Sequence, residues 1–320
     1  MPHVLVVGSL HPTAIAMLDA AEGLSYELTD GTTEDCYAHR IADADILLIR
    51  TQPFTAATIA RAAKLRLVSR HGVGYDAVDL PALTERGIPL CIVGDVNSGG
   101  VAEHAMMMML ASVKLALRAD ASVRKGPWEW RNSLEAGEIT GKNLLILGYG
   151  RIGHKLARLA AGFDMTIRAY DPYLAANSWP AGPVSPIDSL EEGLAWADLV
   201  SIHAPKSDEP LIGADQLRAM KPSAVIVNTS RGGIVDEYAL ADALRQGQIR
   251  AAGIDVFDPE PPLADNPLFG LDNVLLSPHI AGLTEEGSAR LGVHSVQNVL
   301  DFLAGRLNPA LVVNGVSLDG

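Results

Sequence analysis

Short apolar runs rich in Val, Ile and Leu recur along the chain and alternate with longer, Ala-rich amphipathic stretches. This alternation is typical of βα units that build a parallel sheet. We therefore expect an α/β protein with two doubly wound parallel sheets, each in its own domain. The runs predict strands at Val4–Val7, Ile46–Ile49, Leu67–Ser69 and Leu90–Val93, then at Leu144–Leu147, Thr166–Ala169, Leu199–Ile202, Val225–Asn228, Gly253–Val256 and Val274–Leu276.

The stretch between the two sets of strands has the length and the helix-forming residues of one long helix, Val101–Ala119. A Gly-Pro pair follows it, ends any helix and precedes two large aromatic residues, Trp128 and Trp130. This segment predicts a loop or arm that packs on another surface, for example a second subunit. A last apolar-periodic stretch, Ala289–Leu303, lies beyond the second sheet and predicts a helix that returns to the first domain.

Length and composition narrow the possible classes of protein. At 320 residues the chain exceeds the size at which a single core usually stops growing, so two domains are expected. The formal net charge of -13 repels phosphate backbones and acidic membrane surfaces, which argues against a nucleic-acid or membrane partner. An anionic substrate would then need a few well-placed cations, and the Arg and His residues that follow strands become the candidates.

The two cysteines, Cys36 and Cys91, are too few for a disulfide framework and lack the spacing of metal ligands. The chain runs from Met1 directly into the first predicted strand, without the basic flank of a signal peptide. The longest apolar stretch, Ala105–Leu117, is interrupted by Lys114 and is too short to span a bilayer. We expect a cytoplasmic protein without a metal site.

A strand followed by the pattern G-x-G-x-x-G stands near the middle of the chain, with Gly148, Gly150 and Gly153 as its glycines. Glycine turns are common, so the pattern alone also fits an ordinary turn. A helical stretch follows it, however, and the next strand ends at Asp171. In a dinucleotide site the three glycines permit the turn, the approach of the pyrophosphate and the helix packing, and the carboxylate bonds to the ribose hydroxyls. Asp171 would repel the 2′-phosphate of NADP, so the predicted cofactor is NAD.

A second glycine pair, Gly72 and Gly74, follows the strand Leu67–Ser69 but lacks a third glycine and a clear helix start. The pair fits an ordinary turn, and it fits equally well a nest of backbone N–H groups that binds a substrate carboxylate. Spacing alone leaves both interpretations open.

Three polar residues follow successive strands of the second predicted sheet: Arg231, Glu260 and His279. Ligands of open α/β sheets collect at the carboxyl ends of the strands. Oxidation of an alcohol needs a base that titrates near neutral pH, a carboxylate that orients it, and a cation that binds and polarises the substrate. Each residue alone fits an ordinary surface, turn or core position, but three such residues after three strands predict a catalytic group. Asp255 and His203 are lesser candidates.

The chain resembles the D-isomer-specific 2-hydroxyacid dehydrogenase family, which includes phosphoglycerate and hydroxypyruvate dehydrogenases. The resemblance covers nearly the whole length, in the order typical of the family. Its blocks are residues 70–76, Val101 to His104, the glycine pattern through Asp171 and Pro172, residues 201–205, residues 220–222, Asn228 to Gly232, Asp255 to Phe257 with Glu260 and Pro261, and Ser277 to His279.

The resemblance implies a flavodoxin-like substrate domain from residues 1–98 and 290–320, and a Rossmann NAD-binding domain from residues 99–289, with a cleft between them. It also implies that Arg231 binds and polarises a small D-2-hydroxy or 2-keto acid and that His279, supported by Glu260, is the acid/base. The implied cofactor contacts are Gly148, Gly150, Arg151, Ile152, Gly153, Asp171, His203, Thr229, Ser230, Asp255, Ala281 and Gly282. The implied substrate contacts are Arg50, Val73, Gly74, Asn97, Arg231 and His279. A homodimer is expected, with the Trp128 arm in the contact.

One departure affects specificity: Gly100 stands where relatives often carry a serine, so a substrate contact near Asn97 is weakened or relocated. Arg50, Arg70 and His71 can receive a second anionic group such as phosphate or sulfonate, or can be ordinary surface charges. Hydroxypyruvate, glyoxylate, 3-phosphoglycerate and sulfolactate therefore stay open as substrates. The chain has no room after the second domain for the regulatory domain of many phosphoglycerate enzymes, so feedback control is not expected.

Two other functions fit parts of the pattern. Formate and phosphite dehydrogenases are related enzymes, and formate enzymes typically carry glutamine at the position of Glu260, which leaves phosphite as the alternative substrate. The fold also serves an NAD-sensing corepressor, which is not an enzyme. Turnover separates that protein from a dehydrogenase.

Overall fold

The computed structural model of the chain describes residues 1–318. The chain forms two compact units, each with its own parallel sheet. Unit 1 comprises Met1–Asn97 and Leu283–Gly320, and unit 2 comprises Ser98–Gly282.

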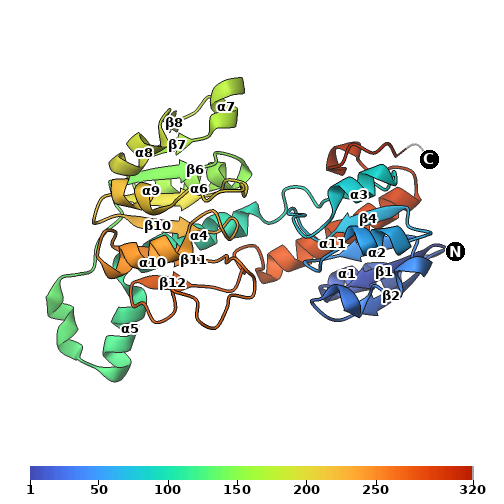
Figure 1. Cartoon of the computed structure of the whole chain (residues 1–320), viewed down its shortest axis with the longest axis horizontal. Coiled ribbons are helices and arrows are strands. Elements are labelled where there is room, and N and C mark those ends of the chain that lie inside the picture. Colours follow the sequence, from blue (N-terminus) through green and yellow to red (C-terminus); the bar gives the residue numbers. More distant parts are fainter. Residues whose placement is uncertain (319–320) are drawn as a thin grey trace. The chain divides into compact units, whose positions relative to one another are not determined.

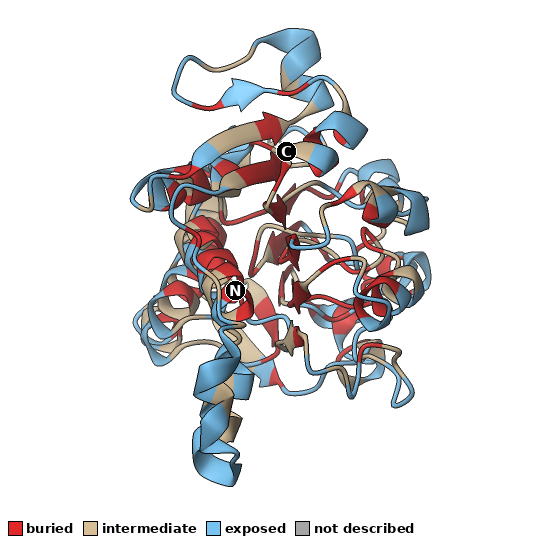
Figure 2. Cartoon of the chain, turned by 90° about the vertical axis from the view of Figure 1, so that its left-hand side faces the viewer, coloured by how far each residue is buried: buried red, intermediate tan, exposed pale blue. Residues whose placement is uncertain are grey.

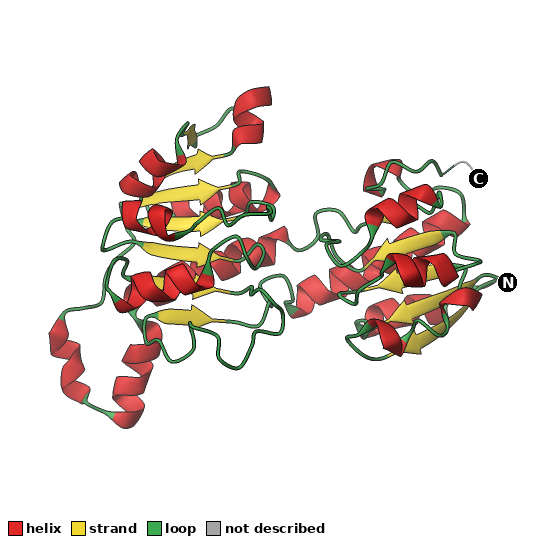
Figure 3. Cartoon of the chain, viewed as in Figure 1, coloured by secondary structure: helices red, strands yellow, loops and turns green. Residues whose placement is uncertain are grey.

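Unit 1 is a five-stranded parallel sheet with helices on both faces (Figures 1 and 3). The strand order is β2-β1-β3-β4-β5. The strands are β1 (His3–Val7), β2 (Ser25–Thr29), β3 (Ile46–Ile49), β4 (Leu67–Arg70) and β5 (Leu90–Cys91). The helices are α1 (Pro12–Asp19), α2 (Ala56–Arg61), α3 (Leu80–Glu85) and α11 (Glu285–Leu303), with short 3₁₀ turns η1 (Glu34–Cys36), η2 (Ile41–Asp43) and η4 (Pro309–Leu311).

Unit 2 is a seven-stranded parallel sheet of order β12-β11-β10-β9-β6-β7-β8. The strand order reverses between β6 and β9, the position at which open α/β sheets bind their ligands. The strands are β6 (Asn143–Leu147), β7 (Thr166–Tyr170), β8 (Ser185–Pro186), β9 (Leu199–Ile202), β10 (Val225–Asn228), β11 (Ala251–Ile254) and β12 (Val274–Leu276). The helices are α4 (Ser98–Lys114), α5 (Ala116–Lys125), η3 (Trp128–Ser133), α6 (Arg151–Ala161), α7 (Pro172–Asn177), α8 (Leu190–Trp196), α9 (Ala214–Ala219) and α10 (Glu237–Arg245).

The central strands of unit 2 are buried on both faces, as Figure 2 shows by their colour. Leu145, Val200 and Ile226 belong to the core on one face, while Leu144 and Val227 belong to the core on the face that α4 and α6 cover. Parallel strands that are buried on both faces have continuous apolar sequences, and this pattern predicts them from the sequence alone.

The predicted α/β class with two parallel sheets is confirmed, but individual elements differ. The single helix predicted over Val101–Ala119 is wrong: the helix breaks at Leu115, whose backbone lies in the left-handed region at φ 52°. Strands β2 and β8 were not predicted because they lie at sheet edges and have mixed polar sequences. The strand predicted at Gly253–Val256 begins two residues earlier, so Asp255 directly follows the strand instead of lying within it.

Helix α5 and the turn η3 form an arm that extends from unit 2 (Figure 1). No residue of α5 is buried, and Leu117, Val123 and Trp128 are each more than half exposed. Within residues 1–318, no single helix is long and apolar enough to cross a membrane; α4 and α5 pass that test only together, across a bend of 56°.

Candidate active site

The glycine-rich turn joins β6 to α6 and leaves space beside the backbone. Gly148 has φ +91°, and a Cβ there would lie 2.7 Å from the His203 carbonyl. Gly150 is the N-cap of α6 and no side chain caps the helix, so the first amides of α6 point outward. A Cβ on Gly150 would meet no atom within 4 Å, whereas one on Gly153 would lie 2.6 Å from the Gly148 carbonyl oxygen. The turn can therefore receive a pyrophosphate next to Gly150, Arg151 and Ile152.

Asp171 directly follows β7 and lies beside this turn. Its carboxylate accepts hydrogen bonds from the Tyr149 amide at 2.9 Å and from the Leu174 amide at 3.0 Å, the second of which caps α7. The two bonds hold the carboxylate next to the glycine-rich turn. Each oxygen keeps a lone pair that can accept from a ribose hydroxyl.

Glu260 and His279, which lie 19 residues apart in the sequence, are brought together in unit 2. The Glu260 Oε2 atom lies 2.7 Å from His279 Nδ1, and Oε1 accepts from the Phe257 amide at 3.0 Å. Burial raises the pKa of the Glu260 carboxyl. The hydrogen bonds from His279 and the Phe257 amide, with the charges of His279 and Arg231, outweigh burial and hold this pKa below its ordinary value. An ionised carboxylate thus orients the imidazole and leaves Nε2 for a reacting group.

Asp255 organises the turn that carries His279. Its side chain is fully buried, and its carboxylate accepts from the amides of Ile280 at 3.0 Å and Ala281 at 2.9 Å and from the Ser277 hydroxyl. His104 on α4 lies behind this cluster, with Nε2 2.9 Å from the Ser277 Oγ atom. In this structure the predicted cofactor contact Asp255 bonds to protein groups of the His279 turn.

Arg231 follows β10, one strand away from β11 in the sheet. Its Nη1 donates to the Ser230 carbonyl at 2.7 Å, and its own carbonyl accepts from the Asn228 side chain at 2.9 Å. The next residue, Gly232, packs against the backbone of Phe257 and Asp258, so the loop that carries Arg231 passes against the turn that leads to Glu260. The structure thus brings Arg231, Glu260 and His279 into one region of unit 2.

The remaining predicted contacts of unit 2 lie at the ends of β9 and β10. The Ser230 hydroxyl donates to the Ala204 carbonyl at 2.6 Å. His203 Nε2 lies 3.0 Å from the Ser201 hydroxyl, and burial lowers the pKa of His203 to about 3, so the ring is neutral. Within residues 1–318, His203 Nδ1 and the Thr229 hydroxyl are buried polar atoms with no hydrogen-bond partner. Such atoms usually have a partner, so these two atoms fit a bound polar group. Of the two residues, His203 lies against the glycine-rich turn at Gly148.

Unit 1 carries a cationic cluster at the ends of its adjacent strands β3 and β4. Arg50 Nη1 donates to the Ser9 carbonyl at 2.8 Å and hydroxyl at 2.9 Å, and Arg70 Nη1 donates to the His71 carbonyl at 2.7 Å. Burial, followed by the charges of Arg50 and Arg70, lowers the pKa of His71 to about 3. Two guanidinium groups therefore lie near one neutral, buried imidazole.

The other predicted substrate contacts also lie in unit 1. Val73 and Gly74 are half-buried residues of the turn after β4, and Asn97 is the half-buried last residue before α4. The geometry of the unit does not decide between an ordinary turn and an anion nest at Val73 and Gly74.

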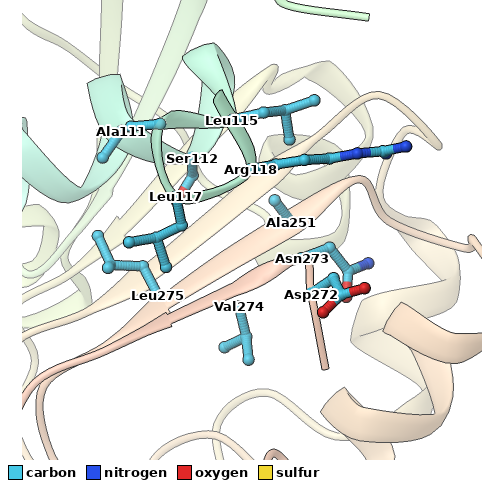
Figure 4. Close-up of a pocket in the computed structure, with 11 residues that line it drawn as sticks. Ala111, Ser112, Leu115, Leu117, Arg118, Ala251, Asp272, Asn273, Val274 and Leu275 are labelled. Carbon is cyan, nitrogen blue, oxygen red and sulfur yellow. The ribbon is translucent and has the colours of Figure 1, made fainter. Parts of the chain in front are cut away.

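Unit 2 has two hollows that are not lined by Glu260 or His279. The first, at the break between α4 and α5, is lined by residues such as Ser112, Leu115 and Val274 (Figure 4) and has a volume of about 20 Å³. That space suits about one water molecule and no substrate. The second, of about 230 Å³, is lined by Glu237, Asp258 and Pro259 among others and lies beside the turn that leads to Glu260.

The sequence alone did not single out several groups that support the site. These groups are His104, Ser277 and Glu237. Each makes its contact with residues 20 or more positions away, so no local pattern identifies it.

Comparison with known proteins identifies the family of the chain. Residues 106–281 match the model described as D-isomer specific 2-hydroxyacid dehydrogenase, NAD binding domain. The chain belongs to this family. The resemblance stated from the sequence is confirmed, and unit 2 contains the NAD-binding domain of the family.

Several relatives of this family match most of the chain. A D-3-phosphoglycerate dehydrogenase of Methanocaldococcus jannaschii is 38% identical over 310 residues, which are 96% of this chain and 58% of that protein. A glyoxylate reductase of Korarchaeum cryptofilum is 38% identical over 279 residues, 85% of this chain and 84% of that protein. A solved structure of a Thermus thermophilus protein has a TM-score of 0.88 and 32% identity and covers 96% of this chain and 98% of its own. The chain spans only 57–60% of the length of the phosphoglycerate relatives.

Proposed function

We propose that the protein is an NAD-dependent oxidoreductase that interconverts a small D-2-hydroxy acid and its 2-keto acid. The observation that carries the proposal is the 2.7 Å contact between Glu260 and His279, with the charge of Arg231 nearby. The names of the relatives, phosphoglycerate dehydrogenase and glyoxylate reductase, support the same reaction class.

In the proposed reaction, His279, Glu260 and Arg231 of unit 2 have different roles. In the direction of reduction, His279 donates the proton on Nε2 to the substrate oxygen, and Glu260 stays ionised and stabilises the imidazolium before transfer. In the direction of oxidation, neutral His279 accepts the hydroxyl proton at the same atom. Arg231 pairs with the substrate carboxylate and polarises the neighbouring carbonyl.

The residues present fit NAD. The open space at Gly150, the uncapped start of α6 and the carboxylate of Asp171 suit a pyrophosphate and an adenosine ribose. The unpartnered Thr229 hydroxyl and His203 Nδ1 fit a polar group of the cofactor. When bound, the nicotinamide accepts or supplies the hydride. Asp171 favours NAD over NADP because its charge repels a 2′-phosphate.

We further propose that the substrate carries a second anionic group, as 3-phosphoglycerate does. The support is the cluster of Arg50 and Arg70 beside His71, in a chain whose net charge is -13. A charge-assisted hydrogen bond contributes about 1.5–3 kcal/mol, which is a factor of about ten or more in binding. The backbone N–H groups of Val73 and Gly74 remain predicted contacts of the substrate carboxylate, and Asn97 remains a predicted substrate contact.

The test is NADH oxidation with glyoxylate, hydroxypyruvate and phosphohydroxypyruvate, for the wild type and for His279→Gln. We expect turnover by the wild type, a loss of about 10²–10⁴-fold in kcat for the variant, and a kcat/KM at least about tenfold higher for the phosphorylated acid. His294→Gln is the matched control, because His294 is an exposed histidine of α11.

The outcomes separate the two proposals. Turnover with equal kcat/KM for all three acids would refute the proposal of a second anionic group on the substrate and would support the proposed reaction. NADH binding without turnover of any acid would refute the reaction and favour a phosphite enzyme or an NAD sensor. The homodimer stays a prediction, and the exposed apolar side chains of the arm support it.

A further inference from the structure

Glu237, the first residue of α10, contacts the turn that leads to Glu260. Its Oε1 atom accepts from the Asp258 amide at 2.9 Å, and its Oε2 atom accepts from the Asn266 side-chain amide at 2.5 Å. The preceding Asp236 caps α10 by accepting from two amides of the first turn, so the helix end that carries Glu237 is itself fixed. One carboxylate thus joins the helix to both ends of the Asp258–Asn266 segment.

The Asp258 amide is the neighbour of the Phe257 amide, to which the Glu260 carboxylate is hydrogen-bonded. Glu260 Oε1 accepts from the Phe257 amide, and its Oε2 faces His279 Nδ1. Two consecutive amides of the turn are therefore held by two carboxylates, the first by Glu260 and the second by Glu237. Phe257 is buried in the core, but Asp258, Pro259 and Glu260 are exposed. Beyond Phe257 the turn is therefore held by its hydrogen bonds and by the ion pair of Asp258 with Lys206, and not by packing.

The side-chain amide of Asn266 is held in one orientation by its two hydrogen bonds. Its Oδ1 atom accepts from the Leu268 amide at 3.0 Å, which directs its NH₂ group at Glu237. Glu237 therefore faces two donors, the Asp258 amide and the Asn266 NH₂ group. A glutamine at this position has one acceptor and would point its own NH₂ group at one of those donors.

We propose that Glu237 is a positioning residue that holds the turn from Phe257 to Glu260 and thereby keeps Glu260 against His279. The inference rests on the proposed function for its catalytic consequence. Its structural part, the restraint of the turn, does not depend on turnover.

The experiment compares Glu237→Gln in the wild type and in a Glu260→Gln background. If Glu237 acts through Glu260, Glu237→Gln lowers kcat about tenfold in the wild type and no more than about twofold in the Glu260→Gln enzyme, because the two changes remove the same contact. NADH binding is expected to stay unchanged. Glu192→Gln, an exposed carboxylate in the first turn of α8, is the matched control for lost charge at a helix start.

Hydrogen exchange of the peptide that contains Phe257 to Glu260 measures the same restraint without substrate. We expect Glu237→Gln to raise exchange there and Glu192→Gln to leave it unchanged. Unchanged exchange, or an equal loss of kcat in both backgrounds, would overturn the inference. Raised exchange in a protein whose wild type turns over no 2-keto acid would keep Glu237 as the restraint and refute only the proposed function.

Discussion

Gly232 lies where the loop that carries Arg231 passes against the loop that leads to Glu260. A Cβ at this position would meet the Phe257 carbonyl far inside the 3.0 Å that Cβ atoms keep, and it would lie 2.8 Å from the Asp258 nitrogen. Both neighbours are backbone atoms, so neither can rotate away. Gly232→Ala must therefore push the two loops apart, by about 1 Å.

This displacement separates Arg231 from Glu260 and His279. Misplacement of a catalytic group by about 1 Å can cost up to about 10²-fold in rate. Overpacking of this kind also costs about 1–3 kcal/mol in the free energy of unfolding. We expect Gly232→Ala to fold with a lowered melting temperature and to lose about 10–100-fold in kcat for reduction of the preferred 2-keto acid. Nearly normal NADH binding is expected, because Gly150 and Asp171 are not displaced.

The assay measures kcat and KM from NADH absorbance, with thermal melting and NADH binding on the same preparations. Gly162→Ala is the control, because Gly162 ends α6 in an ordinary helical conformation and its Cβ would lie 3.3 Å from the Leu159 carbonyl oxygen. A Gly232→Ala enzyme with the melting temperature and kcat of the wild type would refute the close approach of the two loops.

Two further predictions concern the cofactor and the pH dependence of stability. Asp171→Asn keeps the shape of the side chain but removes its charge, so we expect the KM for NADH to rise about tenfold and the preference against NADPH to shrink, both measured by initial rates. Burial raises the pKa of Asp198, but the Asn143 amide and Lys221 outweigh it and hold the pKa below 3.8. This stabilisation is present above that value and is lost as the pH falls through the lowered pKa. Asp198→Asn should then lower the free energy of unfolding by about 1–3 kcal/mol at neutral pH and by much less in acid, as measured by denaturant unfolding. An equal loss at both pH values would contradict the ion pair.

The sequence predicted the central strands because burial on both faces leaves a continuous apolar run. Val225–Asn228, for example, is a fully buried strand and was placed at its observed bounds. Edge strands carry no such pattern: β2 contains Ser25, Tyr26, Glu27 and Thr29 and was missed. The break of the long helix at Leu115 also lacks a Gly or Pro that would have marked it.

The candidate site was predictable where a reactive side chain directly follows a strand. Arg231 and His279 stand out for that reason, and Glu260 stands out in its proline-rich turn. The sequence could not show which atoms meet, because the contact between Glu260 and His279 depends on the course of two separate loops. It could not identify Glu237 either, because that carboxylate resembles any other acidic residue in the first turn of a helix.

Asp255 shows why the supporting groups matter as much as the reactive ones. His279 has φ 53°, a left-handed conformation that residues other than glycine rarely adopt, so its backbone must be held in place. A fully buried carboxylate must have its hydrogen bonds satisfied, and Asp255 satisfies them with the amides of Ile280 and Ala281 and the hydroxyl of Ser277. The groups that satisfy Asp255 are therefore the groups that shape the His279 turn. The position of the imidazole is thus fixed through its backbone turn by the hydrogen bonds of Asp255 and through its Nδ1 atom by Glu260. The contact of Glu237 with the Asp258 amide restrains the turn that carries Glu260.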